Sequence, residues 1–222
     1  MSDSSSLTIS LYSNASCPYA QRTRIALMEK GIEFDFTEID LSNKPEWFTD
    51  VSPTGKVPVM IHDDQRLYES AIINEYIDEV WPSPALMPLN AADRASARIW
   101  IHKSNTSFGS AVFYIGISRD QDRLADLKAS IKTQLQEIER EVFADGRQFW
   151  FGDKPSLVDI TYYSSIERMP VVEKNVGVSL SDFPNTEAWF ERMANRPAVK
   201  ATARTAQQHI ETFDYLSSRI PA

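Results

Sequence analysis

The sequence predicts a small α/β domain followed by a larger all-helical domain. Up to about residue 80, segments typical of strands and helices follow in the order β-α-β-(short α)-β-β-α. A proline-dense stretch comes next, and beyond it apolar residues recur at intervals of three and four, as in amphipathic helices. We therefore expect domains at residues 1–83 and 91–222, joined by a linker at residues 84–90.

Alternating polarity and β-branched content predict the strands of the first domain, and helical spacing predicts its helices. Pro18 suits the first position of a helix, because its φ is already helical and its missing N–H would be unpaired there. Gly31 is a typical end for that helix. Strands are expected at residues 7–12, 34–39, 57–61 and 66–68, helices at 19–30 and 69–80, and a short helical turn at 45–48.

The second half is predicted to be helical almost throughout. Pro82, Pro84 and Pro88 make residues 81–90 unsuited to a helix or a central strand. Ser156 and Asp159 form a variant of the capping box that opens an apolar helix. Further helices are expected at residues 91–117, with a bend near Gly109 or Gly116, and at 124–142, 184–195 and 198–212.

Composition narrows the function classes. The chain has 222 residues and a net charge of −8, which disfavours nucleic acid as the main partner. No apolar run approaches the ~18 residues of a membrane span. One cysteine excludes an intramolecular disulfide and indicates a reducing compartment. The polar start lacks a signal-peptide pattern, so a cytoplasmic protein is expected.

Cys17 is the first candidate for chemistry, because it immediately precedes a predicted helix. Free N–H groups and a partial positive charge at a helix N-terminus stabilise a thiolate and lower the pKa of the thiol. Position 20 is Ala, which excludes a Cys-x-x-Cys couple, so redox turnover would need an external thiol. The alternative is that Cys17 is merely a small apolar residue at a helix start.

Two further signals each have an ordinary structural interpretation. A cis bond between Val57 and Pro58 would leave the Val57 backbone free to pair with a ligand, whereas an edge-strand proline would explain the same residues. Glu69 and Ser70 lie where a strand ends and a helix begins. They could bind an ammonium and a carboxylate respectively, or simply cap the helix.

Together these features resemble the cytosolic glutathione transferases, above all the omega-like, cysteine-type members. The resemblance covers nearly the whole chain. It is carried by Cys-Pro-Tyr-Ala (17–20), Asn-Lys-Pro-Glu-Trp-Phe (43–48), Val-Pro (57–58), Tyr-Glu-Ser-Ala-Ile (68–72) and Glu-Arg-Met (167–169). It implies a thioredoxin-like first domain, an all-helical second domain and an active site in the cleft between them.

The resemblance also implies roles for individual residues. Cys17 would form a mixed disulfide with glutathione, the co-substrate. The resemblance implies that Lys44 meets the glycine carboxylate, Val57 with a cis Pro58 holds the cysteinyl backbone, and Glu69 and Ser70 bind the γ-glutamyl end.

Other roles concern the acceptor and the partners. Tyr19 and Arg168 would line the pocket of a small electrophilic or disulfide acceptor, although Arg168 equally suits a surface or inter-helix ion pair. Lys56, where omega-type relatives often carry an apolar residue, adds charge near glutathione or points to solvent. The resemblance further implies a homodimer and the reactions of cysteine-type members, namely thiol transfer, deglutathionylation and dehydroascorbate reduction.

Three alternatives stay open or are disfavoured. Metal catalysis is disfavoured because His62, His102 and His209 lack ligand spacing. A hydrolase using Cys17 and His62 is compatible with the sequence. The main rival is a regulator that binds RNA polymerase, because residues 69–79 and 82–88 also resemble stringent starvation protein A, with Ser83 where that family has His. The set Cys17, Lys44, Val57, Glu69 and Ser70 favours the enzyme.

Overall fold

The computed structural model describes residues 9–220 and separates into two compact units, Met1–Pro84 and Ala85–Ala222. Each unit is described by itself.

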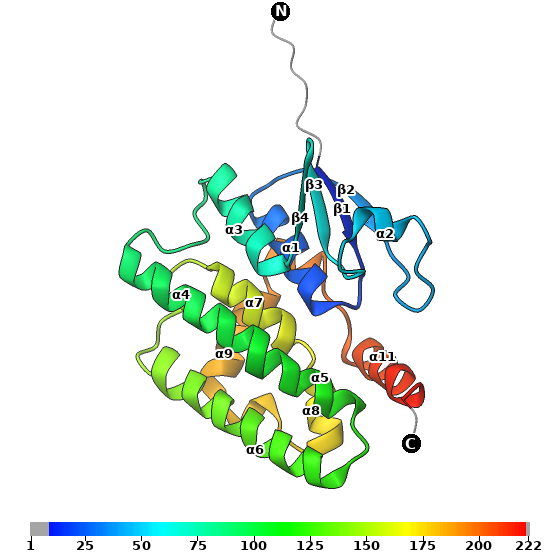
Figure 1. Cartoon of the computed structure of the whole chain (residues 1–222). Helices are drawn as coiled ribbons and strands as arrows, with labels where there is room; N and C mark the ends of the chain where they lie inside the picture. The colour runs from blue at the N-terminus through cyan, green and yellow to red at the C-terminus, as the bar shows by residue number, and fades with distance from the viewer. Residues whose placement is uncertain (1–8, 221–222) are drawn as a thin grey trace, which may run out of the picture. The chain divides into compact units, whose positions relative to one another are not determined.

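The first unit is built on a four-stranded sheet with the order β2-β1-β3-β4 (Figure 1). Strand β2 runs parallel to β1, and the other neighbouring pairs are antiparallel. All four predicted strands are present; residues 7 and 8 of the first lie outside the described part of the chain. The strands are β1 (Ile9–Ser13), β2 (Asp35–Glu38), β3 (Val59–His62) and β4 (Gln65–Tyr68).

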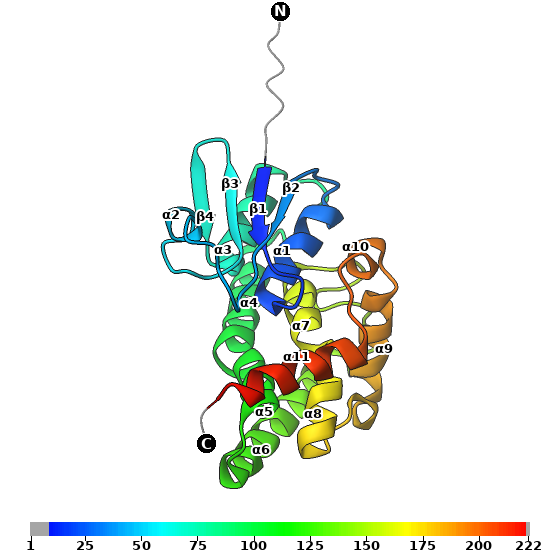
Figure 2. The same ribbon diagram turned by 90° about the vertical axis from the view of Figure 1, so that its right-hand side faces the viewer.

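Three helices accompany the sheet, with α1 and α3 on one face and α2 near the other (Figures 1 and 2). They are α1 (Pro18–Glu29), α2 (Phe48–Val51) and α3 (Ser70–Val80). The short helical turn predicted at residues 45–48 is present, because the Phe48 N–H donates to the Pro45 carbonyl at 3.0 Å, and α2 continues from Phe48. This is the thioredoxin-like arrangement that the resemblance implies, and it brings the starts of α1 and α3 beside the sheet.

The second unit is entirely helical apart from one isolated β-bridge between Phe149 and Gly152, within residues 85–220. Its α-helices are α4 (Ala91–Lys103), α5 (Gly109–Ile117), α6 (Gln121–Glu137), α7 (Leu157–Ile166), α8 (Met169–Val176), α9 (Pro184–Ala194), α10 (Pro197–Lys200) and α11 (Ala206–Ser218). Two π-helical segments, Ser104–Phe108 and Ile138–Val142, and a 3₁₀ turn, Leu180–Asp182, complete it.

The helix predicted at residues 91–117 is interrupted where a bend was expected. The π-helical segment Ser104–Phe108 separates α4 from α5 and ends next to Gly109. The helix predicted at 198–212 is wrong as a single element. A break follows the short α10, and Thr205 and Gln208 form a capping box that starts α11. Helix α8 was not predicted.

Helix α7 forms the centre of the second unit, with all ten of its residues buried. The predicted capping box of Ser156 and Asp159 is confirmed at its start. The Asp159 carboxylate is fully buried and accepts hydrogen bonds from Trp189 Nε1 at 2.8 Å and from the backbone N–H groups of Trp150 and Ser156. This carboxylate therefore ties α7 to α9 and to the loop before α7. Across residues 9–220, the structure contains no helix with the length and apolar character needed to cross a bilayer.

Candidate functional site

Cys17 is the N-cap residue of α1 and ends the loop after β1, which hydrogen bonds of Asn14 hold in place. The Asn14 carbonyl accepts from the Cys17 N–H at 3.2 Å, and the Asn14 side chain donates to Glu38 and to the Ile39 carbonyl. The Cys17 side chain does not cap the helix by a hydrogen bond. The thiol therefore lies at the positive end of the helix dipole, held there by the backbone rather than by its own side chain.

The thiol is half-buried and lies beside the segment that leads into β3. Cys17 packs against a small apolar cluster that includes Ala20 and Val57. Its Sγ is 4.0 Å from the Val57 carbonyl oxygen, so two predicted site residues separated by 40 positions are brought together. The peptide bond between Val57 and Pro58 is cis, as the resemblance implied.

Lys44 and Lys56, the two lysines singled out in the sequence, have exposed side chains. Lys44 lies between β2 and α2. Lys56 precedes Val57, and its backbone N–H and carbonyl both bond to the Ser52 hydroxyl. The Lys56 side chain is exposed to solvent. The hydrogen bonds to Ser52 thus fix the backbone of Lys56, whereas its side chain extends into solvent.

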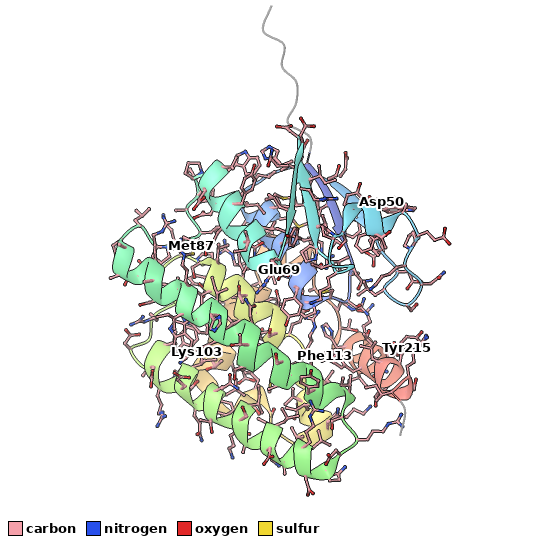
Figure 3. All side chains as sticks on the ribbon, in the orientation of Figure 1. Asp50, Glu69, Met87, Lys103, Phe113 and Tyr215 are labelled. Carbon is pink, nitrogen blue, oxygen red and sulfur yellow. The ribbon has the colours of Figure 1, made fainter. Side chains whose placement is uncertain are left out.

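Glu69 and Ser70 occupy the start of α3, with Glu69 as N-cap (Figure 3). The Glu69 backbone has φ 67°, a value that residues other than glycine rarely adopt. Its side chain is exposed, whereas Ser70 is buried. Strain of this kind persists only where surrounding structure enforces it and is concentrated at ligand-binding positions.

Arg22 was missed by the sequence analysis. It lies on α1, is only 4% exposed, and donates from Nε at 2.9 Å and from Nη2 at 2.6 Å to the Ser70 hydroxyl. The Tyr19 ring lies over its guanidinium, at 5.2 Å from the ring centroid. The available signal was a pair of arginines, Arg22 and Arg24, in a helix whose residues 20–27 are all buried.

These side chains influence one another electrostatically. Burial lowers the pKa of Arg22 to about 10, and the charges of Tyr19, Cys17 and Glu69 oppose that change. Arg22 therefore remains charged at neutral pH. Burial raises the pKa of Tyr19, and the positive charge of Arg22 opposes this increase. Cys17, Tyr19, Arg22, Glu69 and Ser70 thus form one cluster at the starts of α1 and α3.

Arg168 belongs to the second unit and is almost completely buried. Its guanidinium donates to the Ser164 carbonyl and lies 3.5 Å from a carboxylate oxygen of Glu167. The burial of Arg168 excludes the interpretation as a surface ion pair, and its printed ion pair is with the adjacent residue, at the junction of α7 and α8. Glu167 also contacts His209 Nε2 at 3.1 Å.

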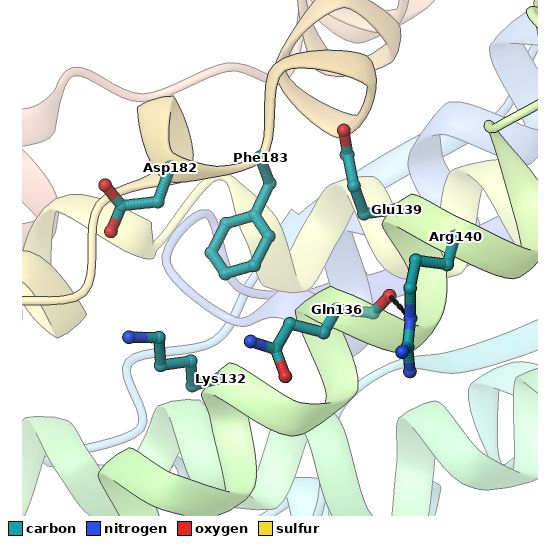
Figure 4. Close-up of a pocket in the computed structure, with 6 residues that line it drawn as sticks. All are labelled: Lys132, Gln136, Glu139, Arg140, Asp182 and Phe183. Atoms are coloured by element: carbon teal, nitrogen blue, oxygen red, sulfur yellow. Dashed lines mark hydrogen bonds between the residues drawn. The ribbon is translucent and has the colours of Figure 1, made fainter.

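Two cavities lie within the second unit. One, of about 410 Å³, is open and lined by polar side chains and Phe183 (Figure 4). In it, Glu139 caps α9 by accepting from the N–H groups of Asn185 and Thr186, and Arg140 Nε donates to the Gln136 carbonyl. The other, of about 340 Å³, lies beside Tyr163 and Phe190. Neither cavity contains a thiol, so thiol chemistry points to the first unit.

Comparisons with known proteins match both halves of the chain. The family model "Glutathione S-transferase, N-terminal domain" matches residues 16–80, and "Glutathione S-transferase, C-terminal domain" matches residues 99–197. The omega-1 glutathione S-transferase of Sus scrofa is 31% identical over 207 residues, covering 93% of this chain and 82% of that protein. The chain belongs to the glutathione S-transferase family.

Solved structures share the fold. A Tau class glutathione S-transferase from mango, Mangifera indica, has a TM-score of 0.86 and 27% identity, covering 94% of this chain and 98% of that one. A rice enzyme solved in complex with glutathione has a TM-score of 0.88 and 24% identity, covering 97% and 99%. The protein is thus a glutathione transferase, with the predicted fold, and glutathione is its co-substrate.

Proposed function

We propose that this glutathione transferase is a cysteine-type enzyme of the omega-like class that transfers thiols. The Cys17 thiolate attacks the glutathione sulfur of a mixed disulfide, and the acceptor leaves as a thiolate. The product is a disulfide between Cys17 and glutathione. A second glutathione thiolate then attacks that disulfide, releases the Cys17 thiolate and forms oxidised glutathione.

The observation that carries the proposal is the position of Cys17 at the N-cap of α1, beside Val57. The partial positive charge at a helix N-terminus stabilises a thiolate, and this has two consequences for the cycle. It increases the thiolate fraction, and it makes Cys17 a better leaving group in the second step. Because the chain has one cysteine, an external thiol must complete the cycle, and glutathione supplies it.

The other predicted residues hold glutathione in this proposal. Backbone pairing with Val57, beside the cis Pro58, aligns the cysteinyl residue and directs its sulfur toward Cys17. Lys44 attracts the glycine carboxylate. Glu69 binds the γ-glutamyl ammonium and Ser70 the adjacent carboxylate, both from the start of α3.

The acceptor and the assembly complete the proposal. Tyr19, which is 38% exposed beside Arg22, contacts a small disulfide or electrophilic acceptor. The enzyme acts in the cytoplasm as a homodimer. Reduction of dehydroascorbate belongs to the same activity, with two glutathione molecules supplying the two electrons.

A disulfide-reduction assay tests the proposal. With hydroxyethyl disulfide and glutathione, the wild type should form oxidised glutathione, and Cys17→Ser should lose this activity. A serine hydroxyl cannot form the mixed disulfide but can donate to a glutathione thiolate, so conjugation to an aryl halide should be retained or increased. Full thiol transfer by Cys17→Ser would contradict the mechanism.

A further inference from the structure

Arg22, in the second turn of α1, is linked to Ser70, the first residue of α3, through one oxygen atom. Two of its nitrogens, Nε and Nη2, donate to the Ser70 hydroxyl at 2.9 and 2.6 Å. Both residues are buried, with 4% of Arg22 and 3% of Ser70 exposed. The orientation of the hydroxyl is therefore set by the guanidinium rather than by exchange with water.

The two hydrogen bonds restrict what Ser70 can bind. A serine hydroxyl has two acceptor lone pairs and one hydrogen to donate. With both lone pairs occupied by Arg22, only the hydrogen remains for a ligand. Ser70 can therefore donate to a carboxylate, but it cannot accept from an ammonium, an amide N–H or another hydroxyl.

The charge of Arg22 strengthens the same preference. The guanidinium is charged at neutral pH and is hydrogen-bonded to the Ser70 hydroxyl. Hydrogen bonds that involve an ionised group are about twice as strong as neutral ones. The neighbouring residue, Glu69, presents an exposed carboxylate with the opposite preference. Adjacent positions at the start of α3 thus distinguish the anionic from the cationic group of an α-amino acid.

We propose that Arg22 is a positioning residue that makes the Ser70 hydroxyl an obligatory donor and thereby gives the enzyme its selectivity for a free α-carboxylate on the ligand. The inference rests on the proposed function only in placing the γ-glutamyl end of glutathione at Glu69 and Ser70. Arg22 acts through Ser70 and need not touch glutathione.

Calorimetric titration with two probes tests this. One probe is S-methylglutathione, and the other is the same compound with its glutamyl α-carboxylate converted to a primary amide. Neither has a free thiol, so the result is independent of Cys17 chemistry. The wild type should bind the carboxylate probe about 10- to 100-fold more tightly than the amide probe.

Arg22→Met should reduce this ratio to within about threefold, because it frees the Ser70 lone pairs and removes the charge. Ser70→Ala should also reduce it. In the Ser70→Ala background, Arg22→Met should change the ratio by less than about twofold, since residues that act as a unit are not additive. A merely structural role for Arg22 would lower stability without changing the ratio.

Arg24→Met is the matched control, because Arg24 is a second buried arginine of α1 that donates to the Ala15 carbonyl instead. It should keep the wild-type ratio. If Arg22→Met does not fold, Arg22→Lys decides, since it keeps the charge but offers one nitrogen and should give an intermediate ratio. A wild-type ratio in either folded Arg22 variant would overturn the inference. Failure of the wild type to bind S-methylglutathione would overturn both the proposed glutathione site and this inference.

Discussion

The Cys17 sulfur lies 4.0 Å from the carbonyl oxygen of Val57. Cys17 occupies the N-cap position of α1, and Val57 lies just before β3, so the first helix and the sheet together form this contact. A peptide that pairs its backbone with Val57 necessarily presents its own side chains close to the thiol. The fold therefore places the Val57 backbone, at which we propose that glutathione pairs, next to the Cys17 sulfur.

Substitutions at Glu69 should separate binding from stability. Glu69→Gln keeps the backbone but removes the charge that we propose binds the glutathione ammonium, so the dissociation constant for glutathione should rise about tenfold. The unfolding free energy should not change, because the side chain is exposed.

Glu69→Gly provides the comparison. It should bind as weakly as Glu69→Gln but be more stable by about 1 kcal/mol, since glycine adopts φ 67° without strain. Urea unfolding and calorimetry measure both quantities. A destabilised glycine variant would show that the Glu69 backbone is not strained.

Ser156→Ala should destabilise the second unit by about 1 to 2 kcal/mol. It removes the cap of α7 and one of the donors to the buried Asp159 carboxylate. Glutathione affinity should be unchanged, because the affected residues belong to the second unit. Thr205→Ala is a suitable control, since it removes the same motif from the exposed start of α11 and should cost less. A large loss of glutathione affinity at an unchanged melting temperature would contradict the structural role.

The N-terminal unit was largely predictable because its signals are local. Pro18 and Gly31 mark the two ends of the first helix through backbone chemistry alone. The second unit was harder to divide into helices. The apolar spacing of residues 198–212 does not show that α10 ends at Lys200; the local signal for the break is the capping box of Thr205 and Gln208, which starts α11.

In the candidate site, too, local signals identify some residues and miss those whose role depends on distant contacts. Cys17, Val57 and Ser70 were identifiable from their positions at element ends. Arg22 was not, because its importance arises from a hydrogen bond to a residue 48 positions away. A buried arginine in a helix looks like an ordinary surface residue until its partner is known.

Stability should fall as the pH decreases from about 6.5, and His209 should account for part of this. Burial lowers the pKa of His209 in the folded protein. Between the two pKa values the unfolded chain binds more protons than the folded one, so the contribution of His209 is complete above about 6.5 and is lost as the pH falls through the folded pKa.

His209→Gln should flatten this dependence, by at most about 1.4 kcal/mol per pH unit, while keeping a donor to Glu167. His102→Gln, at an exposed position, should leave the slope at its wild-type value. Urea titrations at several pH values would measure it. Equal slopes for wild type and His209→Gln would contradict the assignment.

Gly116→Ala should displace α11. A Cβ at this position would lie 2.1 Å from Cδ1 of Phe213, much closer than atoms can approach. The overpacking should cost about 1 to 3 kcal/mol despite the better helix propensity of alanine. Adding Phe213→Leu should recover part of the loss relative to Phe213→Leu alone. A stable Gly116→Ala variant with α11 in place would show that the ring has room to move.

The most direct test of the central claim is the mass of the intact protein after incubation with oxidised glutathione, for the wild type and Cys17→Ser. We predict one glutathione adduct on the wild type, none on the variant, and complete removal of the adduct by reduced glutathione. A folded wild type that acquires no adduct would contradict the proposal that Cys17 is the nucleophile of this glutathione transferase.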